Sequence, residues 1–240
     1  MDKIFYDIYN QYFTDYEPYN AFMFHAEEQL HGLDLQGKDV VEIGCSRGAF
    51  SVYMALTKRA KRVIALDEAE GHGADAQHFY KLNEIINKHD IKNLELRKAD
   101  ITKIAFEKES LDIIVANFSL HHAIRSGGYI FKNEQAREEL LGILKLSHRY
   151  LKSNGFVSLR EMSRLNLWRF MPYKWKMSHI DWDIHPTLRE WLWALKKADF
   201  KNVSYSFLTP FFLCKWPPQL VRNFLANFFF SSTFYLYGHK

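Results

Sequence analysis

The sequence predicts an α/β fold in which a doubly wound, mostly parallel sheet has helices on both faces. Two observations predict it. Short runs rich in β-branched and apolar residues alternate with longer helical patterns over the central two-thirds of the chain. The first of these runs leads directly into a glycine-containing turn and a helix, as a βαβ unit does. With 240 residues, of which 48% are hydrophobic and 25% charged, the chain can bury a sizeable core.

Strands and helices are expected in alternation. The strands of the alternating region are Asp39–Ile43, Arg62–Asp67, Leu94–Arg97, Leu111–Asn117 and Gly155–Arg160, and two more, Lys201–Leu208 and Phe228–Tyr237, end the chain. Apolar residues at helical spacing predict helices at Ala49–Arg59, Ala74–Lys88, Glu134–Leu151 and Thr187–Ala198. The third helix is expected to stop at Ser153-Asn154-Gly155, because Asn and Gly tolerate positive φ.

Two segments outside this alternation are expected to decorate a single domain, residues 1–240. Residues 1–36 form an aromatic, helical lead-in, and residues 161–186 form an insertion rich in Trp, Met, His and Arg between a strand and a helix. No linker or internal repeat divides the chain. At 16%, the aromatic content indicates that large rings fill more of the core than is usual.

Composition excludes several classes of protein. Two cysteines, Cys45 and Cys214, with no C-x-x-C pair, predict neither a disulfide framework nor a structural zinc site, and fit a cytoplasmic setting. The first residues lack the basic start and apolar stretch of a signal peptide. No run of ~18 apolar residues predicts a membrane span. The net charge of +4 is mild.

The turn after the first strand indicates a nucleotide-like ligand that is not a dinucleotide. A dinucleotide fingerprint needs glycines at 44, 46 and 49, whereas this chain has Gly44, Ser46 and Ala49. Glu42 at the mouth of the turn would repel a pyrophosphate and attract a cation. Asp67 closes the second strand, where an α/β nucleotide fold places the carboxylate that accepts hydrogen bonds from ribose hydroxyls. Asp100, after the third strand, is placed to reach an adenine amino group.

These pieces together resemble the class I S-adenosylmethionine-dependent methyltransferases. The matching stretches are VVEIGCSRG, ALD, KAD, ANFSLHHA and LKSNGFVSL, in the family's order over residues 36–160. The chain departs from the family pattern at Ser46, where a glycine is usual, and at Ser153-Asn154, where Pro-Gly is usual. The resemblance implies a Rossmann-like, seven-stranded sheet with an antiparallel last strand, and S-adenosylmethionine as cofactor.

The resemblance also implies which residues line the cofactor site. They are Glu42, Gly44, Cys45, Ser46, Gly48, Asp67, Glu68, Asp100, Ile101, Asn117 and Phe118. His121 and His122 follow the fourth strand beside the expected reaction centre, so they are the candidates for a catalytic base, with a packing role as the alternative. No carboxylates are spaced like a magnesium site, so no metal is expected.

The acceptor pocket is expected to form from the lead-in, the 117–133 loop and the 161–186 insertion. The insertion follows a strand, so it would cover the carboxyl edge of the sheet, where ligands bind in open α/β folds. Rings suit an apolar or aromatic molecule, and polar groups could orient its polar end. The candidate acceptor-binding residues are Arg125, Trp168, Trp175, His179, Asp181 and Trp182.

The favoured function is methyl transfer to a small, largely apolar or aromatic acceptor by in-line displacement at the sulfonium methyl. One alternative is an RNA or protein methyltransferase, which the mixed basic and aromatic residues of 164–176 support. Another is a cofactor-binding fold without methyl transfer. Residues 211–230 (FFLCKWPPQLVRNFLANFFF) are expected to pack their rings on the sheet, with weak association with an anionic bilayer as the less favoured alternative.

Overall fold

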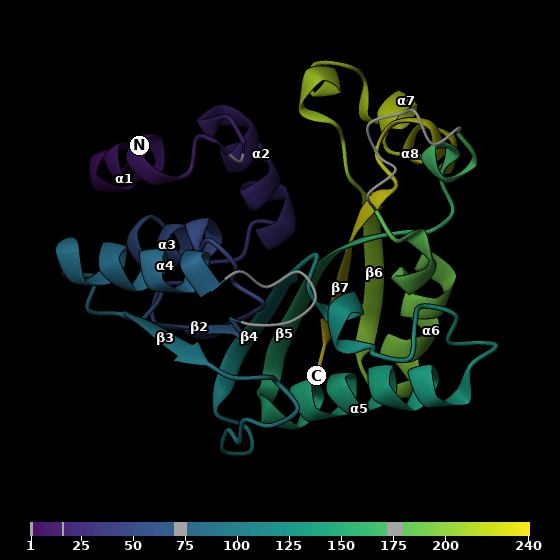
Figure 1. Ribbon diagram of the computed structural model, residues 1–240, viewed down its shortest axis with the longest axis horizontal. Helices are drawn as coiled ribbons and strands as arrows, with labels where there is room; N and C mark the ends of the chain where they lie inside the picture. Colours follow the sequence, from purple (N-terminus) through teal and green to yellow (C-terminus); the bar gives the residue numbers. More distant parts are fainter. Residues whose placement is uncertain (1, 16, 70–75, 172–179) are drawn as a thin grey trace.

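Figure 1 shows the protein as a computed structural model, which describes residues 2–15, 17–69, 76–171 and 180–240. Seven strands in these residues form one sheet in the order β3-β2-β1-β4-β5-β7-β6. They are β1 (Asp39–Ile43), β2 (Arg62–Asp67), β3 (Leu94–Lys98), β4 (Leu111–Asn117), β5 (Leu151–Met162), β6 (Lys201–Phe207) and β7 (Thr233–His239). Strand β7 is antiparallel to both of its neighbours, whereas β1 to β5 are parallel. The predicted fold, including the antiparallel last strand, is confirmed.

The helices cover both faces of the sheet (Figure 1). They are α1 (Lys3–Tyr12), α2 (Tyr19–Leu30), α3 (Ala49–Leu56), α4 (Ala76–Lys88), α5 (Glu134–Tyr150), α6 (Leu188–Lys197), α7 (Pro218–Val221) and α8 (Phe224–Phe230). One buried cluster packs helices α1, α2, α3 and α4 against one face of the sheet, and a second packs α5 and α6 against the other face. Val40 belongs to the first cluster and Val41 to the second, as the alternation of side chains along a strand requires.

The predicted lead-in is helical, as expected, and its rings hold it on the domain. The Phe5 ring on α1 lies 5.8 Å from the Phe22 ring on α2 and 5.5 Å from the Tyr53 ring on α3. Helix α2 is also hydrogen-bonded to the sheet: Gln29 Nε2 donates to the Ala116 carbonyl (3.2 Å), and the Ser158 hydroxyl donates to the Gln29 carbonyl (2.7 Å). The lead-in therefore lies over the carboxyl ends of the central strands.

Two predictions near strand ends are wrong. Strand β5 begins at Leu151, directly after α5, and residues 153–155 form an irregularity inside the strand: its pairing with β4 shifts from Leu111–Leu151 to Ile113–Phe156. The last strand begins at Thr233 instead of Phe228, because the aromatic run before it forms α8. The Asn223 side chain caps this helix by accepting a hydrogen bond from the Ala226 N–H (2.9 Å).

Candidate functional site

The turn between β1 and α3 lies at the carboxyl edge of the sheet, where the strand order reverses and open α/β sheets bind ligands. Gly44, Ser46 and Gly48 all have left-handed backbone conformations, with φ of 70°, 47° and 81°. The N–H groups of Gly44 and Cys45 donate to the Leu66 carbonyl at 2.8 and 2.9 Å. These bonds fix the turn against the end of β2.

Ser119 secures the other side of this turn. Its hydroxyl donates to the Ile43 carbonyl at 2.5 Å. A Cβ atom on Gly44 would lie 2.3 Å from the Cβ of Ser119, so only glycine fits there. The buried Cys45 packs under the turn, and burial raises the pKa of its thiol well above the usual range, so it is not a nucleophile.

Glu42 is buried beneath the turn, whereas the sequence suggested a position at its mouth. The Ser51 hydroxyl and the Asn117 amide nitrogen both donate to the Glu42 carboxylate, the latter at 3.3 Å. Burial raises the pKa of Glu42 to about 7. The buried Asn117 Oδ1 accepts no hydrogen bond from the described residues. This corner of the site therefore offers two acceptors to a ligand that brings a positively charged donor.

The next acid along the edge, Asp67, is fixed by the backbone. Its two carboxylate oxygens accept hydrogen bonds from the N–H groups of Ser46 and Ala69, both at 2.8 Å. Each oxygen can accept a second hydrogen bond. Asp67 can therefore accept hydrogen bonds from two ligand hydroxyls, which is the role that the sequence predicts for it.

Arg125 connects the remaining two acids of the predicted cofactor site. Its Nη2 lies 3.2 Å from Asp100 Oδ2 and 3.6 Å from Glu68 Oε1. Ile101 beside them is buried and contributes packing. We expected Arg125 among the acceptor-binding residues, but the structure places it with the acids of the predicted cofactor site.

The two candidate catalytic histidines lie in a buried polar cluster. His121, only 2% exposed, places its Nδ1 2.6 Å from Glu161 Oε2, and the other Glu161 oxygen accepts from the Leu120 N–H at 3.1 Å. The His121 ring centre lies 4.1 Å from those of both His122 and His185. This geometry fixes His121 within the fold.

The insertion contributes a cover for the histidines. Burial lowers the pKa of His185 to about 3, helped by His121 and His122, so His185 is neutral at physiological pH. The buried Trp182 ring lies 5.9 Å from the His185 ring. Among the other predicted acceptor residues, Asp181 is exposed and caps a short turn, and Trp168 is half-buried on the residue 167–170 turn. Trp175 and His179 lie outside the described residues.

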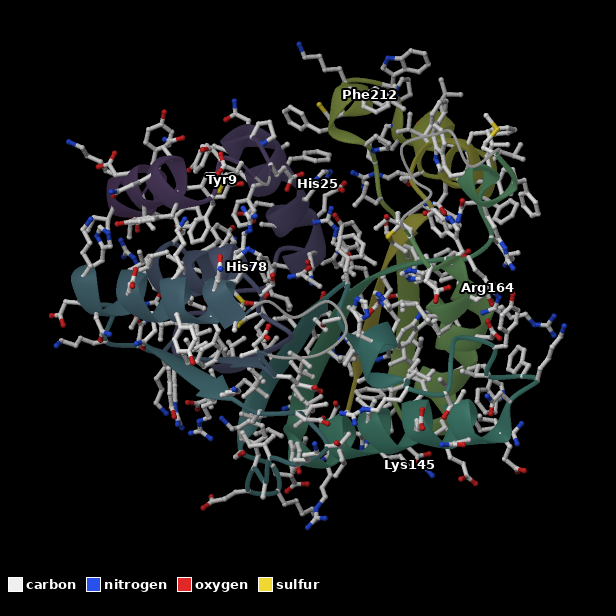
Figure 2. The ribbon with its side chains drawn as sticks, in the orientation of Figure 1. Tyr9, His25, His78, Lys145, Arg164 and Phe212 are labelled. Carbon is white, nitrogen blue, oxygen red and sulfur yellow. The ribbon has the colours of Figure 1, made fainter. Side chains whose placement is uncertain are left out.

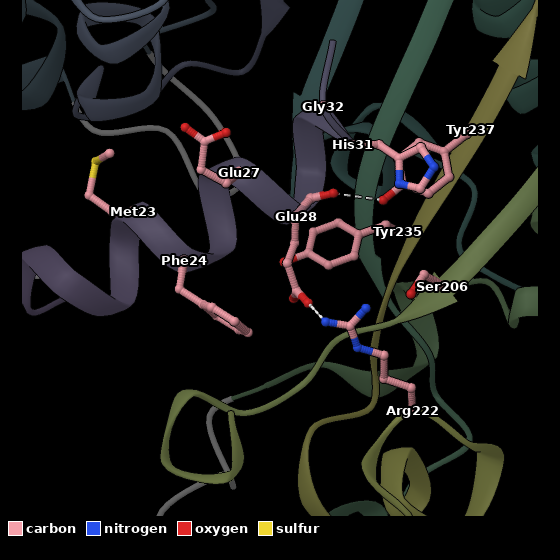
Figure 3. A pocket seen from close by; sticks show the side chains of 10 residues that line it. All are labelled: Met23, Phe24, Glu27, Glu28, His31, Gly32, Ser206, Arg222, Tyr235 and Tyr237. Carbon is pink, nitrogen blue, oxygen red and sulfur yellow. Dashed lines mark hydrogen bonds and ion pairs between the residues drawn. The ribbon is translucent and has the colours of Figure 1, made fainter. Parts of the chain in front are cut away.

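A cavity of about 600 Å³ lies between α2 and the β6–β7 half of the sheet (Figure 3). Rings and a thioether make up much of its wall, which also contains the Glu28 and Arg222 side chains, in direct contact as an ion pair. The lining residues are Met23, Phe24, Glu27, Glu28, His31, Gly32, Ser206, Arg222, Tyr235 and Tyr237. Of the predicted acceptor-binding residues that the structure describes (Arg125, Trp168, Asp181 and Trp182), none lines it. Among the described residues of the segments expected to form the acceptor pocket, only those of the lead-in contribute to this cavity.

A row of paired residues joins this cavity to the glycine turn. Asn117 on β4 pairs with Arg160 on β5, Arg160 with Tyr235 on β7, and Tyr235 with Ser206 on β6. With strands ~4.8 Å apart, Tyr235 lies only ~10 Å from Asn117 along the sheet. The Arg160 guanidinium stacks on the Phe118 ring at 4.8 Å, and its buried Nε has no hydrogen-bond partner among the described residues.

The donor and acceptor groups of this edge suit a particular ligand chemistry. The carboxylates of Glu42, Asp67 and Asp100 and the free amide oxygen of Asn117 would repel phosphates, but they can bind an ammonium group, ribose hydroxyls and an amino group. The residues therefore fit S-adenosylmethionine, which has all three. A family described as "Methyltransferase domain" matches residues 41–159, which include the turn, the acids and the histidines. The chain belongs to the class I S-adenosylmethionine-dependent methyltransferases.

The known proteins that this methyltransferase resembles are distant relatives. Phosphoethanolamine N-methyltransferase 1 of Caenorhabditis elegans is 27% identical over 170 residues, which span 66% of this chain but only 30% of that enzyme. A SAM-dependent methyltransferase from Aquifex aeolicus shares the fold with a TM-score of 0.60 and 16% identity, over 93% of both chains. Geranyl diphosphate C-methyltransferase from Streptomyces coelicolor A3(2) gives 0.64 and 17%, over 93% of this chain and 80% of its own. S-adenosylmethionine is the cofactor.

Sequence reasoning missed two residues of this methyltransferase site. Ser119 follows the predicted cofactor residues Asn117 and Phe118 directly, but only the folded chain shows that it hydrogen-bonds the end of β1. Arg160 was included only as the last residue of a predicted strand. A cation that ends a parallel strand at the carboxyl edge is the signal that could have found it.

Proposed function

We propose that the chain transfers the methyl group of S-adenosylmethionine to a small, largely apolar or aromatic acceptor that enters the cavity between α2 and β7. The observation that supports this most is the row from Asn117 through Arg160 to Tyr235, which brings a ring-lined cavity within ~10 Å of the cofactor edge. A volume of about 600 Å³ is in the range of sites for small ligands.

Residues on both sides of the glycine turn would hold the cofactor. Asp67 accepts the ribose hydroxyls, Asp100 the adenine amino group, and Glu42 with Asn117 the ammonium of the amino-acid end. Gly44, Ser46 and Gly48 let the backbone approach closely, and Cys45, Glu68, Ile101 and Phe118 complete the wall. When bound, the cofactor supplies a methyl group on an electrophilic sulfonium.

The chain's own part in the reaction is positioning and exclusion of water. Tyr235 and Tyr237 line the cavity with their rings, against which an apolar or aromatic acceptor can pack. Glu161 holds the Nδ1 of His121, and His121 is only 2% exposed and does not line the cavity. We therefore assign His121 a positioning role, with His122, the less buried of the two, as the remaining candidate base.

Filling the cavity tests this assignment. Ser206→Trp places an indole in the cavity, whereas Tyr205→Trp changes the neighbouring side chain on the opposite face of β6, where Tyr205 is exposed. Release of S-adenosylhomocysteine is measured with aromatic and prenyl-type metabolite fractions. We expect Ser206→Trp to lower kcat/KM at least roughly tenfold without changing the Kd for S-adenosylhomocysteine. Equal turnover in Ser206→Trp, Tyr205→Trp and the unaltered protein would refute the cavity as the acceptor site.

A second acceptor class is a small phosphorylated amine. The cavity contains a carboxylate, Glu28, and a guanidinium, Arg222, which could bind the amine and the phosphate of one molecule. The similarity to phosphoethanolamine N-methyltransferase 1 also points to this class. Methylation of phosphoethanolamine in the same assay, lost in Arg222→Met, would favour it over an apolar acceptor.

The RNA alternative loses part of its support in the structure. Two of the cations in residues 164–176 are already paired: Arg164 with Glu190 at 2.6 Å, and Arg169 with Asp183 at 2.7 Å. If RNA were the acceptor, its affinity would fall steeply as salt is added. A fold that binds the cofactor without methyl transfer would release no S-adenosylhomocysteine with any acceptor fraction.

A further inference from the structure

The segment between β6 and β7 has an apolar surface. Six large side chains of residues 211–230 are more than half exposed, and Phe212 reaches 72%. The six are Phe212, Trp216, Leu220, Phe224, Leu225 and Phe230. Figure 2 shows Phe212 at the outer end of this segment, beyond the ends of β6 and β7. The expectation that these rings pack on the sheet is wrong.

Helix α8 has its polar side inward and its apolar side outward. Asn227 is buried, and its amide nitrogen donates to the Thr233 carbonyl at 2.5 Å and to the Ser231 hydroxyl at 2.9 Å. Phe224, Leu225 and Phe230 on the same helix are exposed. A helix at a water-facing surface has the opposite arrangement. The buried Asn227 holds the exposed rings in place, so their exposure is a feature of the folded chain.

The charged residues of the segment itself are all basic. The sequence contains no Asp or Glu between residues 200 and 240, whereas Lys215 and Arg222 lie within the segment. Lys215 is exposed, and Arg222 pairs with Glu28 of α2. Exposed rings, a tryptophan beside two prolines and the exposed Lys215, in a segment that contains no acid, complement a surface of anionic headgroups over acyl chains.

We propose that residues 211–230 insert into the headgroup–acyl boundary of a bilayer that contains anionic lipid. Binding is peripheral: no helix in the described part of the chain is long and apolar enough to cross a membrane. A protein partner fits less well, because the rings come from separate turns and short helices that project outward. Arg222 belongs both to this segment and to the cavity wall, so an acceptor dissolved in the bilayer would have a short path to the cavity.

Vesicle flotation tests the proposal without cofactor or acceptor, so its outcome is independent of the proposed function. The unaltered protein is mixed with vesicles of phosphatidylcholine alone or with roughly a third phosphatidylserine. The test variant is Phe212→Glu with Leu225→Glu. The matched control is Ile4→Glu with Tyr80→Glu, because Ile4 on α1 and Tyr80 on α4 are 59% and 63% exposed outside the segment. Circular dichroism and the Kd for S-adenosylhomocysteine confirm that both variants fold.

We expect the unaltered protein and the control to float with anionic vesicles, and the bound fraction of the test variant to fall roughly tenfold or more. Acyl-chain-brominated lipid should quench tryptophan fluorescence in the unaltered protein and less in Trp216→Phe. A protein that stays in the soluble fraction with both vesicle types overturns the proposal. Equal flotation of the test variant and the control also overturns it. The same holds if no flotation occurs and the unaltered protein forms a dimer that the test substitutions dissociate, because the surface would then bind a second copy.

Discussion

Gly44 and Ser119 are in such close contact that a single methyl group on Gly44 would lie 2.3 Å from the Ser119 Cβ. Gly44→Ala should therefore displace Ser119 and strain a backbone held at φ 70°. We expect the Kd for S-adenosylhomocysteine to rise at least roughly tenfold, measured by calorimetry. Adding Ser119→Gly removes the colliding atom and should restore part of the affinity. A Gly44→Ala variant with unchanged affinity would show that the turn does not depend on this contact.

Cofactor affinity should depend on pH through Glu42. Its pKa of about 7 means that the carboxylate loses its proton as pH rises through neutrality, and the ionised form attracts the ammonium of the ligand. Affinity for S-adenosylhomocysteine should therefore rise roughly tenfold from pH 6 to pH 8. Glu42→Gln keeps the shape of the side chain and removes the charge, so its affinity should be lower and nearly constant over this range. Identical pH profiles of the two proteins would exclude Glu42 from cofactor binding.

His121 should matter more for stability than for proton transfer. In His121→Ala the fully buried Glu161 loses the partner 2.6 Å from its carboxylate, and leaving one member of a buried pair alone costs about 3 kcal/mol or more. Chemical denaturation should show this loss, and the double variant His121→Ala, Glu161→Gln should recover part of it. If His121→Ala unfolds like the unaltered protein but has lost its kcat, then His121 is a catalytic base after all.

His185 gives the fold a defined sensitivity to acid. The folded chain keeps it neutral, with a pKa of about 3, whereas the unfolded chain binds a proton near the ordinary pKa of 6.5. The unfolded state thus binds more protons below pH 6.5, so the free energy of unfolding falls as pH drops. One such group contributes a loss of about 1 kcal/mol between pH 7 and pH 5.5. In His185→Gln the fall in the free energy of unfolding between pH 7 and pH 5.5 should be smaller by about 1 kcal/mol. An equal fall in the two proteins would contradict the assignment.

Local patterns predicted the centre of the fold, and residues far apart in the chain decided the rest. Gly44, Glu42 and Asp67 were found because a turn and the ends of two neighbouring strands have signatures within a few residues. The contact of Gly44 with Ser119 depends on β4 lying beside β1, which spacing alone does not reveal. The aromatic run at 228–230 has the composition of a strand, but capping of the preceding turn by Asn223 and burial of Asn227 make it the end of a helix. The position of Arg125 beside two carboxylates was not predicted, because these partners follow other strands.

The most direct test of the central claim, that the edge around Glu42 and Asp67 binds S-adenosylmethionine, is a calorimetric titration with S-adenosylhomocysteine and with NADH. We expect one molecule of S-adenosylhomocysteine per chain, no binding of NADH, and in Asp67→Ala a loss of about 1.5–3 kcal/mol from the hydrogen bonds to the ribose. Tight binding of NADH with none of S-adenosylhomocysteine, or full affinity in Asp67→Ala, would contradict the account.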